Sequence, residues 1–174
     1  MSDRMAISHE NVTLLPDAGP LITLAYADAL DLLFKPGWQV AIVDMVLHEV
    51  TRNITPTSEK LGFWAQGSNV QIISTHTFAE HSQNPSKKAH LGEQAIQETL
   101  SKFALLPTAQ DAVLLFEDHA IANNTFFVPS GCQKVSTRAF LIFLEQNGWI
   151  ENAADIERRA IHAGRQFSQL RFPA

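Results

Sequence analysis

The sequence predicts an α/β fold in which helices cover both faces of a mostly parallel sheet. Short apolar runs alternate with helical patterns along the chain, which is typical of parallel strands joined by helical crossovers. The chain has 174 residues and is 45% hydrophobic, enough apolar material for one core. No internal repeat or low-complexity tract divides it, so we expect a single domain over residues 1–174.

Strands are expected where short apolar runs are closed by turn-forming or polar residues. These runs are Val12–Leu15, Val40–Val43, Val70–Ile73, Val113–Phe116 and Phe126–Val128. In open parallel sheets, ligands bind beyond the carboxyl ends of the strands. The residues that directly follow each strand are therefore the first candidates for a functional site.

Helical patterns fill the intervals between the strands. The expected helices are Pro20–Phe34, Met45–Arg52, Ser58–Gln66, Gly92–Phe103, Thr137–Gln146 and Ala154–Arg165, with a short helical segment from His119. Gly19 is the expected cap of the first helix because Pro20 suits the first helical position. Gly148 is the expected C-terminal cap of a later helix, and the polar segment Ser82–His90 is expected to be an exposed loop.

Charge and cysteine content limit the class of protein. The net charge of −5 and a pI near 5.7 argue against binding nucleic acid or anionic lipid through bulk electrostatics, which leaves local sites. A lone Cys132 forbids an intrachain disulfide. Met1–Asn11 lacks the apolar core of a signal peptide, and Leu14–Phe34 is too interrupted by Pro and Asp to span a membrane. We therefore expect a cytoplasmic protein that is not in a membrane.

Asp17 is the first carboxylate in a place that suggests function. It follows the first expected strand and precedes Gly19-Pro20, where the first helix opens. With Gly19 as the cap, Asp17 remains at the strand end, on the edge of the sheet where ligands bind. The alternative is an ordinary capping or turn aspartate.

Glu49 is expected on an inward face of its helix. At about 100° per residue, Met45, Val46 and Val50 form an apolar face, and Glu49 falls within or beside it. A carboxylate in that place costs free energy unless it is paired or binds a cation. The alternative is an ion pair with Arg52 or a solvated edge.

Glu93 borders the core in the first turn of its helix. It shares a helical stripe with Ile96, Leu100 and Phe103, whereas Glu98 is expected on the solvated face. A favourable interaction with the helix dipole is the structural alternative for Glu93.

Two adjacent acids, Glu117 and Asp118, follow the strand that ends at Phe116. We favour Asp118 as a ligand because its shorter side chain is placed more rigidly, and Glu117 remains the alternative. One of the two acids could instead cap the short segment from His119.

The four acids Asp17, Glu49, Glu93 and Asp118 form a set if the fold brings them together. Like charges at close range repel and raise one another's pKa, and a hard divalent cation removes that conflict. Mg²⁺ and Mn²⁺ take oxygen ligands and retain waters, one of which can attack a phosphodiester. The seven histidines show no zinc-ligand spacing.

These residues resemble the motifs of PIN-domain nucleases, in the correct order over about 14–150. The similar segments are LLPDAGPLITLA from Leu14, VDMVLHEV from Val43, HLGEQAIQETL from His90, VLLFEDHAIAN from Val113 and VSTRAFLIFLEQNGWI from Val135. The nearest subgroup looks like the prokaryotic toxin–antitoxin type.

The resemblance implies a Rossmann-like three-layer α/β/α sandwich, PIN-like, with a motif-bearing core over about 12–150 and a C-terminal helix at 154–165. It implies an Mg²⁺- or Mn²⁺-dependent endoribonuclease that binds its metal through Asp17, Glu49, Glu93 and Asp118, with Glu117 as the alternative to the last. RNA is the implied substrate, and Thr137 of the closing motif is expected to help position it. Arg138 is a second candidate for contact with the RNA backbone because it lies next to Thr137, near the predicted site. A homodimer and, for a toxin, an antitoxin protein are the implied partners.

The chain departs from the family pattern at one point. Many members have Ser or Thr after the first acid, where this sequence has Ala18-Gly19. This departure motivates a second hypothesis, a catalytically inactive PIN-like module that binds RNA or protein. A third, phosphatase-like or receiver-like reading is disfavoured because the Asp-x-Asp signature is absent after Leu15.

Overall fold

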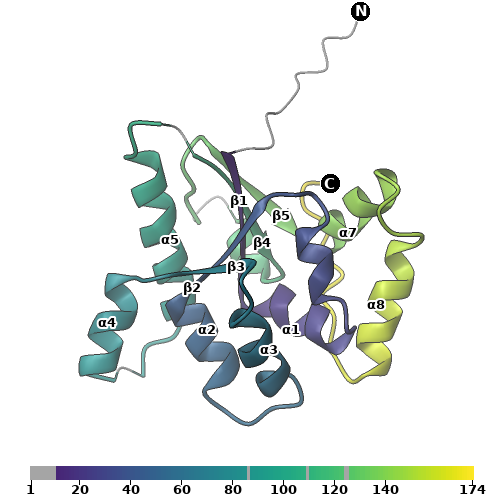
Figure 1. The fold of residues 1–174 in the computed structure, drawn as a ribbon, viewed down its shortest axis with the longest axis horizontal. Coiled ribbons are helices and arrows are strands. Elements are labelled where there is room, and N and C mark those ends of the chain that lie inside the picture. Colours follow the sequence, from purple (N-terminus) through teal and green to yellow (C-terminus); the bar gives the residue numbers. More distant parts are fainter. Residues whose placement is uncertain (1–10, 86, 109, 124–125) are drawn as a thin grey trace, which may run out of the picture.

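The computed structural model describes residues 11–85, 87–108, 110–123 and 126–174. Residues 1–10, on which the expectation of no signal peptide mainly rests, lie outside the described residues. In the described part, five parallel strands form one sheet in the order β3-β2-β1-β4-β5 (Figure 1). The strands are β1 (Val12–Pro16), β2 (Gln39–Val43), β3 (Val70–Ile73), β4 (Asp111–Phe116) and β5 (Cys132–Ser136).

The predicted fold class is confirmed, because the sheet is parallel and helices flank it. The helices are α1 (Ala18–Tyr26), the 3-10 helix η2 (Leu30–Phe34), α2 (Asp44–Thr51), α3 (Ser58–Ala65), α4 (His76–Gln83), α5 (Leu91–Ala104), α6 (His119–Ala122), α7 (Thr137–Gln146) and α8 (Ala153–His162). Gly148, which follows α7 with φ 72°, fills the predicted C-terminal cap.

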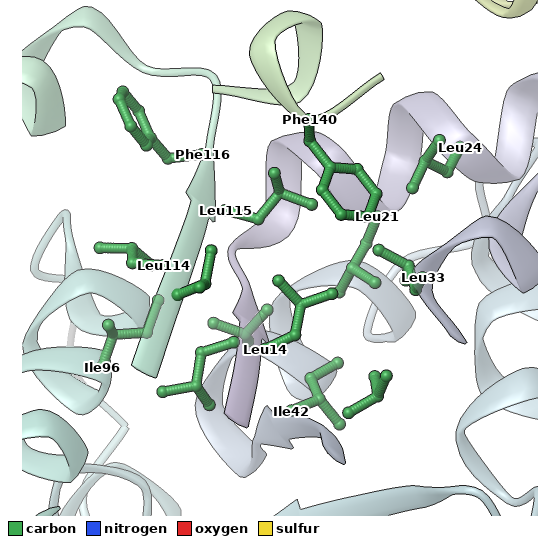
Figure 2. Close-up of a cluster of buried hydrophobic side chains, with 14 of the residues drawn as sticks. Leu14, Leu21, Leu24, Leu33, Ile42, Ile96, Leu114, Leu115, Phe116 and Phe140 are labelled. Carbon is green, nitrogen blue, oxygen red and sulfur yellow. The ribbon is translucent and has the colours of Figure 1, made fainter. Parts of the chain in front are cut away.

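The core lies on both faces of the central strands. Along β4, Leu114 and Phe116 alternate with Leu115, as strand geometry requires. Figure 2 shows Ile96 of α5 on the side of Leu114 and Phe116, and Phe140 of α7 near Leu115. All five side chains are buried. Both faces of the sheet are therefore covered, which explains the near-continuous apolar run of β4.

The fifth predicted strand was wrong. Phe126–Val128 is not a strand; the fifth strand is β5, which pairs only with β4 and is the edge of the sheet. An edge strand tolerates polar residues such as Gln133 and Lys134. Lys134 Nζ donates to the carbonyl oxygens of Ile121, Asn123 and Phe126, which ties β5 to these residues before it.

The start and end of the first predicted helix also differ. The helix begins at Ala18, so the N-cap is Asp17 and not Gly19. It ends at Tyr26 and is followed by the separate η2, because Asp28 adopts a left-handed backbone with φ 53°. In the described residues no helix is long and apolar enough to cross a membrane.

Helix α4 was not predicted, and it shortens the expected loop Ser82–His90 to the residues after Gln83. Its polar sequence gives no apolar stripe. Glu98 of α5 instead holds its first turn, by accepting bonds from His76 N at 2.7 Å, Thr77 N at 3.0 Å and Thr77 Oγ1 at 2.9 Å. Glu98 is thus not merely solvated, as expected, but joins two helices.

Glu98 is expected to contribute to stability at neutral pH. Burial alone would raise the pKa of its carboxyl, but bonds from Lys102, His76 and Thr77 lower that pKa to about 2. Glu98→Gln should lower the free energy of unfolding by about 1.5–3 kcal/mol in chemical denaturation, the range for hydrogen bonds to a charged group. Glu151→Gln, at an exposed acid before α8, is the control.

The pH dependence of this effect follows from the lowered pKa. The stabilisation is complete above the usual value of 4.5 and is lost as pH falls towards 2, because protonation then removes the charge that the donors bind. The difference between wild type and Glu98→Gln should therefore shrink below pH 4.5. A difference that stays constant down to the acid transition contradicts this assignment.

Candidate metal site

An acidic pocket of about 420 Å³ lies at the carboxyl ends of β1 and β4. The strand order reverses between these two strands, since β2 and β3 lie beyond β1 while β5 lies beyond β4. Such a switch point leaves a crevice at the strand ends where ligands bind in α/β sheets. The pocket is lined by Asp17, Ala18, Gly19, Glu49, His90, Gly92, Glu93, Glu117, Asp118, Arg165, Gln166 and Ser168.

Asp17 is held rigidly at the end of β1. Its backbone N–H continues the ladder to β4 by donating to Leu115 O at 2.9 Å. Although Asp17 is the N-cap of α1, its side chain accepts no capping bond, so the carboxylate is left for the pocket. Burial, offset in part by a bond from the Ala18 N–H and reinforced by the charges of Glu49, Glu93 and Asp118, raises the pKa of Asp17 to about 7.

Glu49 reaches the pocket from α2 and is fixed by α5. Its Oε1 accepts a bond from Gly92 N at 3.1 Å, in the first turn of α5. Burial raises the pKa of Glu49, and the bond from Gly92 offsets part of that rise. The approach is so close that a Cβ on Gly92 would lie 2.6 Å from Glu49 Oε2, which explains the glycine.

Glu93 enters the pocket from the next residue of α5. Its Oε2 lies 3.1 Å from His90 Nδ1, and His90 precedes the helix in a left-handed conformation with φ 66°. The Glu93 side chain is 21% exposed, so it is partly shielded from water at the mouth of the pocket.

Glu117 and Asp118 both line the pocket, but in different ways. Glu117 is 7% exposed; its Oε2 accepts from Arg165 Nη2 at 3.0 Å, while its buried Oε1 has no hydrogen-bond partner among the described residues. Asp118 is exposed and caps α6, by accepting from Ala120 N at 2.8 Å. Asp118 thus has the capping role that the sequence offered as an alternative, and it also lines the pocket where it was expected as a ligand.

The structure does not bring Thr137 and Arg138 to the lining of this pocket. Thr137 is buried at the start of α7, and its hydroxyl has no hydrogen-bond partner among the described residues. Arg138 makes a two-pronged ion pair with Glu157 of α8, at 2.9 and 2.8 Å, and donates to Gln169 O. Because an α-helix turns by about 100° per residue, Arg138 faces α8 although it directly follows Thr137 in sequence.

Sequence reasoning missed the contribution of the C-terminal segment. Arg165, Gln166 and Ser168 follow α8 and line the pocket, far from the motifs in sequence. The signal available was Gly164, which comes at the end of a helical pattern and marks a change of chain direction.

A second cavity, of about 440 Å³, lies at the opposite, amino ends of the strands. Its lining is mainly apolar, with side chains such as Trp38, Phe140 and Phe143. Among its described lining residues Asp111 is the one carboxylate, so this cavity has no set of acids comparable to that at the other end of the sheet.

The residues of the acidic pocket fit a hard divalent cation. The donors are carboxylate oxygens, and one of them, Glu117 Oε1, is buried without a partner among the described residues. Burial and, to a smaller extent, the charges of the neighbouring acids raise the pKa of Asp17. Within the described ranges, however, no group of three or more His, Cys, Asp or Glu side chains is arranged so that it could hold a metal ion. Glu49, Glu117 and Asp118 each accept a hydrogen bond from a protein donor instead.

Comparison with known proteins identifies the fold. The sequence matches no family model, and no curated protein matches it closely enough to be a relative. A solved structure, the T. brucei RRP44 PIN domain, is similar with a TM-score of 0.50 and 14% identity, over 81% of this chain and 83% of that chain. The chain therefore has a PIN-like α/β fold.

Proposed function

We propose that the chain is an Mg²⁺- or Mn²⁺-dependent endoribonuclease. The observation that carries the proposal is the convergence of Asp17, Glu49, Glu93, Glu117 and Asp118 on one pocket at the switch point of the sheet. Four of these acids are the predicted metal ligands, and they come from four separate parts of the chain: the end of β1, α2, α5 and the end of β4. PIN domains typically bind divalent metals, which agrees with this donor set.

The chemistry expected of the pocket is phosphodiester hydrolysis. A bound divalent ion would supply a water of lowered pKa and positive charge for the phosphate oxygens. Asp17 and Glu49 would bind the ion from the rigid end of β1 and from α2, while Glu93 and Asp118 would complete the ligand set or orient bound water. Glu117, paired with Arg165, is less available as a ligand than Asp118.

The partners belong to the same proposal. RNA is the proposed substrate, and a homodimer and an antitoxin protein are the proposed partners of a toxin–antitoxin member. An acidic pocket repels an RNA phosphate until cations neutralise it, so we expect substrate binding there to depend on the divalent ion.

The direct test is cleavage by the purified chain. End-labelled single-stranded RNA is incubated with Mn²⁺, with Mg²⁺ and with EDTA, and metal binding is measured separately by calorimetry. Internal cleavage with a divalent ion and none with EDTA is expected. If the chain neither cleaves RNA nor binds Mn²⁺ at millimolar concentration, the nuclease is rejected in favour of the inactive PIN-like module.

That second candidate rests on specific features of the pocket. Glu49, Glu117 and Asp118 are already bonded to protein donors, and Ala18 carries no hydroxyl. An inactive module would bind RNA without cleaving it, and its affinity would not depend on Mn²⁺.

A further inference from the structure

Arg165 is a fixed cation in the acidic pocket, delivered by the chain reversal after α8. Gly164 adopts φ 111°, which L side chains rarely adopt, and Arg165 N donates to Ala160 O at 3.0 Å. This turn closes the end of the helix and starts the segment that passes over α1 into the pocket. A glycine is needed here because of the backbone conformation.

Three hydrogen bonds hold the Arg165 guanidinium. Nε donates to Thr23 Oγ1 at 2.9 Å, and Nη2 donates to Glu117 Oε2 at 3.0 Å and to Gly19 O at 3.4 Å. The side chain is 22% exposed, so it is largely shielded yet still open to the pocket. Its rotamers are thus restricted before any ligand arrives, which lowers the entropic cost of binding.

The segment that carries Arg165 is fixed further along as well. Arg138 Nη1 donates to Gln169 O at 3.0 Å, and Ser136 exchanges bonds with the backbone of Phe172 through its N–H and its hydroxyl. Arg138 was predicted to contact substrate, but in the structure it holds the C-terminal segment that carries Arg165.

The donors of Arg165 are not exhausted by these partners. Nη1 has no acceptor among the described residues, and Arg165 is the one Lys or Arg among the described residues that line the pocket. A guanidinium matches two oxygens of a phosphate with parallel N–H donors. The other charged side chains of the lining are five carboxylates, and His90 is the remaining titratable residue, so Arg165 is the permanently charged cation available to an anionic substrate among the described lining residues.

We propose that Arg165 binds a non-bridging oxygen of an RNA phosphate in this pocket, with Glu117 as the residue that positions it. The inference rests on the proposed function and adds a substrate contact outside the recognised motifs. In this assignment Glu117 orients the Arg165 side chain, while Asp17, Glu49, Glu93 and Asp118 bind the divalent cation.

The test measures RNA binding separately from cleavage. A fluorescent single-stranded RNA is titrated with the full chain in Ca²⁺, with its integrity checked on a gel. Arg165→Gln should weaken binding by at least about 10-fold, the loss that one hydrogen-bonded charge contact produces. Arg159→Gln, which removes the same charge from an exposed position on α8, should stay within about 2-fold because exposed charges contribute little.

A double variant separates contact from charge balance. Arg165→Gln with Glu117→Gln keeps the wild-type net charge and does not leave the buried Glu117 carboxylate without its cation, so RNA binding can still be compared if the single variant unfolds. Direct contact predicts that its RNA binding remains at least about 10-fold weaker than wild type. Wild-type affinity in the double variant, or equal affinities of Arg165→Gln and Arg159→Gln, overturns the proposal.

The outcome distinguishes this inference from the proposed nuclease. Cleavage by wild type with equal RNA binding by all variants rejects the role of Arg165 and retains the nuclease. Arg165-dependent binding without Mn²⁺-dependent cleavage retains the RNA contact and rejects the nuclease. Absence of RNA binding by the wild type in Ca²⁺ rejects the contact.

Discussion

Asp17→Asn is expected to reduce Mn²⁺-dependent RNA cleavage by at least about 100-fold, since loss of a residue that merely orients a metal ligand already costs about 10–100-fold. Asn keeps the shape of the side chain but loses the charge that binds a cation. Asp17 is also the most deeply buried of the four proposed ligands. Because it is fixed at the end of β1, no neighbouring side chain can replace it unless the backbone moves.

The same substitution should stabilise the metal-free protein. Burial and neighbouring carboxylates raise the pKa of Asp17 to about 7, so holding its charge in the folded state is unfavourable at and above neutral pH. Asn removes that cost, and at pH 8 in EDTA the Tm should rise by at least about 2 °C, the shift that ~1 kcal/mol gives in a domain of this size. Added Mn²⁺ should raise the Tm of wild type more than that of the variant.

Asp31→Asn is the matched control, because Asp31 is an exposed acid on η2 outside the pocket. It should leave cleavage and the Mn²⁺ effect unchanged. Undiminished cleavage by Asp17→Asn would show that the catalytic assignment is wrong. A lower Tm without metal would show that Asp17 is a structural residue.

The central strands and the acids that follow them could be predicted because local pattern and topology agree there. The apolar runs of β1 and β4 are buried on both faces, and Asp17 and Glu117 follow them directly. The rule that ligands bind at strand ends then needs no knowledge of distant contacts. Glu49 and Glu93 could be placed on inward faces for the same reason, since helix period alone fixes a face.

What could not be predicted depends on contacts between distant segments. The edge strand β5 carries Gln133 and Lys134 and has no apolar run to reveal it. Arg165 meets Thr23 across 142 positions of sequence through the turn at Gly164. Arg138 was judged by its neighbour Thr137, whereas its direction depends on the packing of α7 against α8.

Gly92→Ala is expected to weaken Mn²⁺ binding by about 10–100-fold while the fold is preserved, because it displaces Glu49 and no other residue of the pocket. The added Cβ would lie 2.6 Å from Glu49 Oε2, so the carboxylate must rotate away and its bond from Gly92 N is lost. The atom that gives way is the far end of a flexible side chain, so the backbone of α5 need not move.

Two effects on stability oppose each other in this variant. Alanine favours a helix over glycine by about 0.5–1 kcal/mol, and loss of the bond to a carboxylate costs a similar or larger amount. Gly62→Ala in α3 is the control, because its Cβ would meet only Thr51 Cγ2 at an ordinary 3.8 Å. Calorimetry with Mn²⁺ and thermal unfolding compare the two variants. If Gly92→Ala binds Mn²⁺ as tightly as Gly62→Ala, Glu49 is not a metal ligand, because its carboxylate cannot keep its present position beside that methyl group.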